Sequence, residues 1–179
     1  MKHRFKLLRL LIIAILLWCA GSYSYRYFQP MEVVDIVKSS DGFYDYIVVK
    51  NPPLNERRFI RWWQENKETI KAQYDVPSER DDGVFAIGVW EIGADGYETD
   101  KNGELKGFND VYDQTCIMEL PHEARCVDKK NFYARIGRAR GGWYSIGFAR
   151  AEKYIGWGNG NKYIHWGDGH FKKEVKAED

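Results

Sequence analysis

The chain has few of the residue patterns that mark a catalytic centre or a metal site. It contains only three cysteines, and the closest pair, Cys116 and Cys126, is separated by nine residues. Paired cysteines in zinc sites usually stand roughly two to four residues apart, with a second pair or histidines completing the ligand set. The sequence has no second cysteine pair, so we predict no metal site at these cysteines.

Nucleophile and phosphate-binding motifs are also absent. Ser145 has Trp143 two residues before it, where the nucleophile elbow of a hydrolase needs glycine. The glycine-rich segment 156–162 lacks the spacing of a phosphate-binding loop and is not followed by a helical pattern. The sequence contains no solenoid repeat and no low-complexity linker. We therefore assign no catalytic residue and no cofactor, and expect a protein that is not an enzyme.

Acidic residues are missing from the first 31 positions, and this absence points to a membrane segment. Four basic residues begin the chain, a sixteen-residue uncharged run covers Leu10–Tyr25, and Arg26 follows it. A helix needs roughly 20 apolar residues to cross a bilayer, and the flanking residues supply the missing length. We predict a membrane-spanning helix over Leu7–Phe28, with the lipid bilayer as its partner.

Two other fates of this segment are compatible with its composition. A cleaved signal peptide has the same charged start, and Ala20-Gly21-Ser22 offers small residues for cleavage. A lipoprotein would carry its lipid on Cys19, but Trp18 stands where a small residue is expected. Aromatic residues gather at the far end of the run, as in the belt at a membrane interface: Trp18, Tyr23, Tyr25, Tyr27 and Phe28. That belt favours an uncleaved anchor.

The flanking charges predict the orientation of the anchor. Basic residues concentrate before the apolar run, and the side of a membrane that carries them is usually the cytoplasm. We therefore expect residues 1–28 to form a cytoplasmic start and a single-pass anchor in a bacterial inner membrane. Residues 29–179 then form one periplasmic domain, whose length suits a single hydrophobic core.

The composition of this domain excludes one class of partner. Residues 30–179 hold 22 of the 27 basic residues and all 26 acidic residues, which gives a formal charge of −4. Nucleic-acid-binding domains usually carry a basic patch or a high pI, so we expect no nucleic-acid partner. In an oxidising periplasm, Cys116 and Cys126 are most simply explained as a disulfide. Closing that short loop stabilises a fold by on the order of 2–3 kcal/mol.

Hydrophobic patterns predict an α+β fold, with one amphipathic helix against a mainly antiparallel sheet of five to seven strands. The helix covers Asn55–Tyr74, begins at an Asn55 N-cap and carries a stripe of Phe59, Trp62, Trp63, Ile70 and Tyr74. We expect one of its two adjacent tryptophans to anchor it to the sheet. Strands are expected at 31–38 and 43–50, as a hairpin, and at 84–92, 131–138, 142–150, 162–166 and from 171. The segment 93–107 is expected to be a loop, and 172–179 a frayed tail.

Several segments of the chain resemble one known family. They are Pro30–Val34, Val48–Pro52, Ile60–Lys67, Tyr74–Pro77 and Tyr112-Asp113 ahead of the two cysteines. With the amino-terminal anchor, they are similar to a family of enterobacterial membrane proteins of unknown function, small and single-span, over most of residues 1–138. Beyond Gly137 the chain departs from the family, with a longer end rich in glycine and tryptophan. The resemblance implies a membrane-anchored domain with one disulfide and supplies no catalytic residues.

The last forty residues contain the candidates for partner binding. Aromatic side chains alternate there with glycines and charges, a composition typical of protein interfaces. We predict that the partner-binding residues are Trp143, Tyr144, Trp157, Tyr163 and Trp166. Neighbouring residues of a strand point to opposite faces, so about half of the aromatic residues in this end of the chain are expected in the core. The predicted function is a periplasmic binding protein, most concretely an immunity protein that blocks a secreted antibacterial effector.

Two other functions remain open on the sequence alone. His165, Asp168 and His170 could ligate a metal in an envelope enzyme, because Gly167 and Gly169 would let the loop wrap a small ion. The same Gly-Asp-Gly sequence is typical of a hairpin turn, which we favour. An accessory subunit of a membrane complex would also need the anchor helix.

Overall fold

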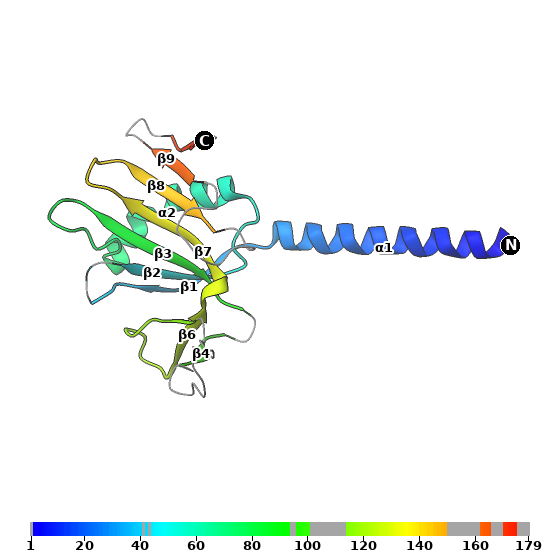
Figure 1. Ribbon diagram of the computed structural model, residues 1–179, viewed down its shortest axis with the longest axis horizontal. Coiled ribbons are helices and arrows are strands. Elements are labelled where there is room, and N and C mark those ends of the chain that lie inside the picture. Colours follow the sequence, from blue (N-terminus) through cyan, green and yellow to red (C-terminus); the bar gives the residue numbers. More distant parts are fainter. Residues whose placement is uncertain are drawn as a thin grey trace, which may run out of the picture.

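A long helix projects from one side of a β-rich domain in the computed structural model of the chain (Figure 1). The structure describes residues 2–40, 42, 44–93, 96–100, 114–149, 162–165 and 170–174. The helices are α1 (Lys2–Phe28), α2 (Glu56–Tyr74) and the short 3-10 helix η2 (Lys129–Asn131). The strands are β1 (Glu32–Val37), β2 (Asp45–Lys50), β3 (Phe85–Glu91), β4 (Glu98–Thr99), β5 (Gln114–Cys116), β6 (Ala124–Asp128), β7 (Phe132–Arg138), β8 (Tyr144–Phe148), β9 (Lys162–His165) and β10 (Lys172–Lys173).

α1 has the length and composition of a membrane-spanning helix. Its apolar part, Arg9–Phe28, is 20 residues long, and none of it is buried inside the protein. Large apolar side chains are exposed all along this part, from Leu10 at 64% to Phe28 at 74%. Apolar surface on every side of a helix is typical of contact with lipid. The predicted apolar helix at the amino terminus is therefore confirmed.

The large sheet contains seven strands in the order β1-β2-β3-β7-β8-β9-β10. β1 and β2 pair as the predicted antiparallel hairpin. β2 and β3 pair in parallel, because the chain crosses through α2 between them. All other neighbours in this sheet are antiparallel. The α+β class and the mainly antiparallel sheet are confirmed.

α2 packs its apolar stripe on one face of this sheet. The side chain of Asn55 accepts a hydrogen bond from the Arg57 amide and forms the predicted N-cap. Phe59, Trp63 and Ile70 are buried in the core between α2 and the sheet. The inclusion of Tyr74 in the stripe was wrong, since Tyr74 is 47% exposed in the last turn. The spacing of apolar residues predicts which side of the helix a side chain lies on. It does not predict whether the sheet is long enough to cover that side chain at the end of the helix.

A second, three-stranded sheet lies beside the first, in the order β4-β6-β5. Its residues Glu98–Thr99 interrupt the predicted loop 93–107, and β5 and β6 were not predicted at all. Strands of two to five residues are too short to show a hydrophobic period. A second core joins the two sheets and contains Val48, Ile92, Ile117 and Leu120.

A short last strand is present where one was expected from residue 171, and it includes two residues of the segment 172–179 that was expected to be a frayed tail. Lys172 and Lys173 form β10, which pairs with β9, and the Glu174 amide donates to the Lys162 carbonyl over 2.7 Å. Charged residues can form an edge strand because its outer side faces water.

Candidate functional site

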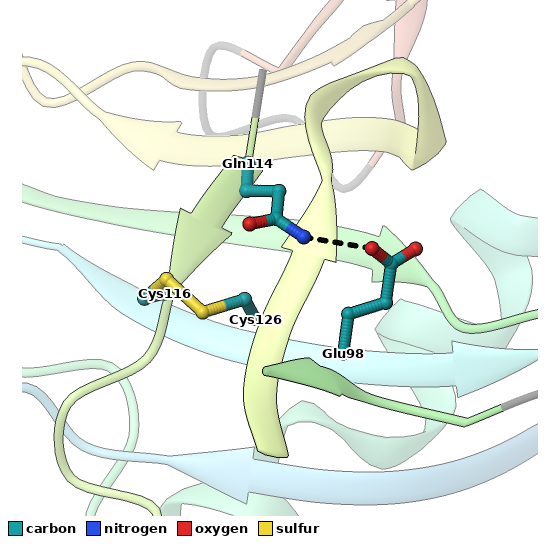
Figure 2. The surroundings of a disulfide bond; sticks show 4 residues. All are labelled: Glu98, Gln114, Cys116 and Cys126. Carbon is teal, nitrogen blue, oxygen red and sulfur yellow. Dashed lines mark hydrogen bonds between the residues drawn. A yellow bond between two sulfur atoms is a disulfide. The ribbon is translucent and has the colours of Figure 1, made fainter. Parts of the chain in front are cut away.

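The disulfide links the two longer strands of the small sheet. Cys116 and Cys126 stand opposite each other in the β5–β6 register, and their sulfur atoms are bonded (Figure 2). Beside them, the Gln114 amide donates a hydrogen bond to the Glu98 carboxylate over 2.7 Å. Asp100 lies near both cysteines, but sulfur atoms bonded to each other offer no thiolate to an ion. The predicted disulfide is confirmed, and its place in the small sheet indicates a structural role.

The predicted aromatic binding residues divide between two faces of the large sheet. Tyr163 is 8% exposed, and its hydroxyl donates to the Glu56 carboxylate over 2.7 Å. Burial and this hydrogen bond raise the pKa of Tyr163 to about 12. Tyr144 is half-buried on the same face, with its ring 5.5 Å from that of Phe85. Both therefore belong to the α2 side of the sheet, whereas Trp143 lies on the opposite side. Trp157 and Trp166 lie outside the described residues.

His165 belongs to an aromatic cluster at the end of β9. Its ring centre lies 6.2 Å from that of Tyr144 and 5.3 Å from that of Phe171. His170 is exposed, and Asp168 lies outside the described residues. The packing of His165 is typical of a structural ring, and the hairpin turn at 167–169 stays a prediction.

The face of the large sheet opposite α2 carries two rows of mostly small side chains. The register aligns one row of Gly88, Arg135, Gly147 and Lys162. It aligns a second row of Ala86, Gly137, Ser145 and Ile164. Alternation along β7 and β8 places both rows on the other side from Ile136 and Ile146, which belong to the α2 core. We use the name open face for the outer part of this surface, formed by the half-buried residues Arg135, Gly137, Trp143, Ser145, Gly147 and Lys162.

Two cations and two aromatic rings lie on the open face or beside it. The Lys162 ammonium lies 4.9 Å from the centre of the Trp143 ring and 3.3 Å from the Glu174 carboxylate. The Arg135 guanidinium lies 5.9 Å from the centre of the Tyr44 ring. Burial lowers the pKa of Arg135, but arginine stays protonated at neutral pH. The open face therefore offers positive charge and aromatic surface around a floor of glycine and serine.

Tyr44 and Trp90 lie beside Gly88 of β3, next to the open face. Burial raises the pKa of Tyr44 to about 12. Trp90 is 6% exposed, and its buried indole N–H has no hydrogen-bond partner in the described part of the chain. A buried donor without a partner is costly, so this N–H is a position where an acceptor from a ligand or an ordered water would be stabilising.

Tyr44, Trp90 and Arg135 were not predicted to be neighbours. The signal was present in Gly88, because glycine inside a strand often marks the close approach of another group. A methyl group at Gly88 would stand 2.5 Å from the Tyr44 hydroxyl oxygen and 2.8 Å from the Trp90 indole nitrogen. A methyl group at Gly147 would meet no atom within 4 Å.

These two glycines give a matched pair of substitutions. We expect Gly88→Ala to displace the Tyr44 ring and to lower the free energy of unfolding by about 1–3 kcal/mol through overpacking. We expect Gly147→Ala to be neutral or to stabilise by up to about 1 kcal/mol, since it restricts the unfolded chain without a clash. Chemical denaturation of both variants in detergent measures the difference. Equal stability of the two would mean that Tyr44 does not occupy the space above Gly88.

Side-chain contacts fix the anchor helix to the domain. Arg26 donates to the side chains of Asn51 and Glu91, each over 2.8 Å. Arg58 of α2 donates to the Tyr27 carbonyl over 2.6 Å, and its guanidinium lies 5.3 Å from the centre of the Tyr27 ring. These contacts join α1 to β3, to α2 and to the loop between β2 and α2. The domain therefore packs against the end of its anchor through these side chains.

Comparison with known proteins agrees with this architecture. The family model described as enterobacterial putative membrane protein (DUF943) matches residues 2–162, from the start of α1 to the start of β9. No curated protein and no solved structure matches the chain. The match extends past Gly137, so the departure from the family expected there was wrong up to residue 162. It covers the candidate membrane helix, the small sheet with its disulfide and the large sheet up to the start of β9, so the chain belongs to the enterobacterial putative membrane protein family.

Proposed function

We propose that this chain is a membrane-anchored binding protein without catalytic activity, and that the open face receives a protein partner. The observation that carries the proposal is the arrangement of Trp143, Lys162 and Arg135 around a floor without large side chains. Aromatic and arginine side chains contribute most to binding energy at protein interfaces. A floor of glycine and serine lets the partner approach the backbone of the sheet.

The charges of the open face select the kind of partner. Its two basic side chains lie one on each side of Gly147 in the same row, so an acidic partner surface would be attracted to both. The Lys162–Glu174 ion pair lies at the rim, and an incoming carboxylate can compete with Glu174 for the ammonium. The proposed partner is therefore a protein with an acidic patch.

The most specific form of the proposal is an immunity protein. The anchor would place the domain in the periplasm of a bacterium, with the amino terminus in the cytoplasm, at the inner membrane. A secreted antibacterial effector that acts in that compartment would meet the open face there. The contacts of Arg26 and Arg58 between anchor and domain support this form, because contacts that restrict the domain before binding reduce the entropy lost on binding.

The test is affinity purification of the tagged, full-length protein from native membranes, with mass spectrometry of the intact bait and the recovered proteins. We expect one stoichiometric, toxin-like partner with the wild type and with Tyr74→Ala, an exposed aromatic position in the last turn of α2. We expect Trp143→Ala to lose it. A bait with an intact amino terminus would establish the uncleaved anchor.

Two results would contradict the proposal. Retention of the partner by Trp143→Ala, with loss in Tyr74→Ala, would place the interface away from the open face. Recovery of the bait alone, with a bound metal that is lost in a His165→Ala/His170→Ala variant, would point instead to an envelope enzyme.

A further inference from the structure

The edge of the domain next to the membrane anchor exposes basic and apolar side chains. β2 and β3 end at this edge and α2 begins there, as the contacts of Arg26 and Arg58 require (Figure 1). Leu54, just before α2, is 51% exposed. Arg57 and Arg61 are exposed on the first two turns of α2, four residues apart and therefore on one side of the helix.

Two carboxylates of the same edge are engaged within the protein. Glu56 accepts the hydrogen bond of the Tyr163 hydroxyl, and Glu91 pairs with Arg26. Glu32 stands opposite Lys50 in the β1–β2 register. In contrast, Arg57 and Arg61 are absent from the ion pairs of the described residues, although Arg57 acts electrostatically on Tyr163. Both side chains are exposed, so their guanidinium groups are accessible to a ligand at the surface of this edge.

We propose that Leu54, Arg57 and Arg61 form a contact site for the headgroups of anionic phospholipids, in the leaflet where α1 leaves the membrane. Gln29, Pro30 and Met31 are the only residues between α1 and β1, so the edge cannot move far from the bilayer. Planar guanidinium groups bind phosphate through paired hydrogen bonds, and Leu54 can enter the interface between headgroups and acyl chains. The headgroups would then contact the edge of the domain next to the anchor, in addition to the contacts that Arg26 and Arg58 make between α1 and the domain. This inference does not depend on the partner of the open face.

The experiment compares full-length protein in two kinds of nanodisc, one of phosphatidylcholine alone and one with added phosphatidylglycerol. Hydrogen–deuterium exchange is measured for peptides that cover residues 50–62. We expect slower exchange in the anionic discs, and reversal of the effect at high salt. Each arginine near an anionic surface contributes roughly fivefold to binding, so Arg57→Gln/Arg61→Gln should abolish the difference between the discs.

A matched variant separates a local effect from a general loss of positive charge. Arg80→Gln/Arg140→Gln removes two exposed arginines that pair with Asp82, in the loops between α2 and β3 and between β7 and β8. This variant should keep the slower exchange in anionic discs. Arg57→Glu/Arg61→Glu should make exchange faster in anionic discs than in neutral ones. Equal exchange of the wild type in both discs would overturn the proposal, as would loss of the difference in Arg80→Gln/Arg140→Gln alone.

Discussion

Replacing Asp45 by alanine is expected to lower the free energy of unfolding by on the order of 3–5 kcal/mol. Asp45 is 1% exposed at the start of β2, yet it carries a carboxylate. It accepts hydrogen bonds from the Ser39 amide over 2.9 Å, the Ser78 amide over 2.5 Å and the Ser78 hydroxyl over 2.9 Å. Alanine would leave the buried Ser39 amide and the two part-buried Ser78 donors without this acceptor, and each unpaired buried donor costs about 1–3 kcal/mol.

Asp45 connects segments that are distant in sequence, so its substitution is expected to weaken tertiary contacts. Ser39 belongs to the β1–β2 connection and Ser78 to the α2–β3 connection, so one carboxylate joins two loops. Glu119 extends the network, since it accepts from the Ser40 amide over 2.9 Å. This hydrogen bond lowers the pKa of Glu119. Three separate segments of the chain thus depend on two carboxylates at this end of the sheet.

Chemical denaturation of the full-length protein in detergent, followed by tryptophan fluorescence, measures the effect of the Asp45 substitution. The control is Asp81→Ala, an exposed aspartate in the same connection between α2 and β3, which should change stability by less than about 0.5 kcal/mol. Equal losses in the two variants would show that the carboxylate of Asp45 contributes nothing specific to the fold.

The helices and strands whose hydrophobic pattern extends over many residues were predictable from the sequence. The apolar run before Arg26 predicted α1, and the stripe around Phe59 and Trp63 predicted α2 with its Asn55 N-cap. Alternation and β-branched residues predicted the central strands of the large sheet. The small sheet was not predictable, because strands of two to five residues have no period of their own. They depend on the disulfide and on a core shared with the large sheet.

The candidate site was predicted only in part, for a related reason. Composition pointed to the aromatic residues near the carboxyl terminus, but composition does not state which face of a strand each residue occupies. The register sends Tyr163 into the core and its neighbour Lys162 to the open face. Tyr44 just before β2, Gly88 of β3 and Arg135 of β7 lie close together although they are distant in sequence. Only the order of the strands brings them together.

The adjacent tryptophans of α2 should respond to substitution in clearly different ways. Trp63 is 2% exposed, so Trp63→Ala should cost about 3–5 kcal/mol through lost burial and a remaining cavity. Trp62 is half-buried, with its ring centre 5.5 Å from that of Phe59. Trp62→Ala should therefore cost less, about 1–2 kcal/mol. Chemical denaturation of both variants in detergent gives the comparison.

Trp62→Ala and Trp63→Ala also test whether α2 contributes to partner binding or only to the packing of the core. If Trp62 serves only the core, Trp62→Ala should keep the protein partner at temperatures where the variant is folded. Loss of the partner by folded Trp62→Ala, with a stability close to that of the wild type, would move the interface from the open face to α2. Equal destabilisation by both substitutions would instead mean that the helix is held by the two rings together. Because Trp63 lies in the core with Phe59 and Ile70, we expect its substitution to have the larger effect.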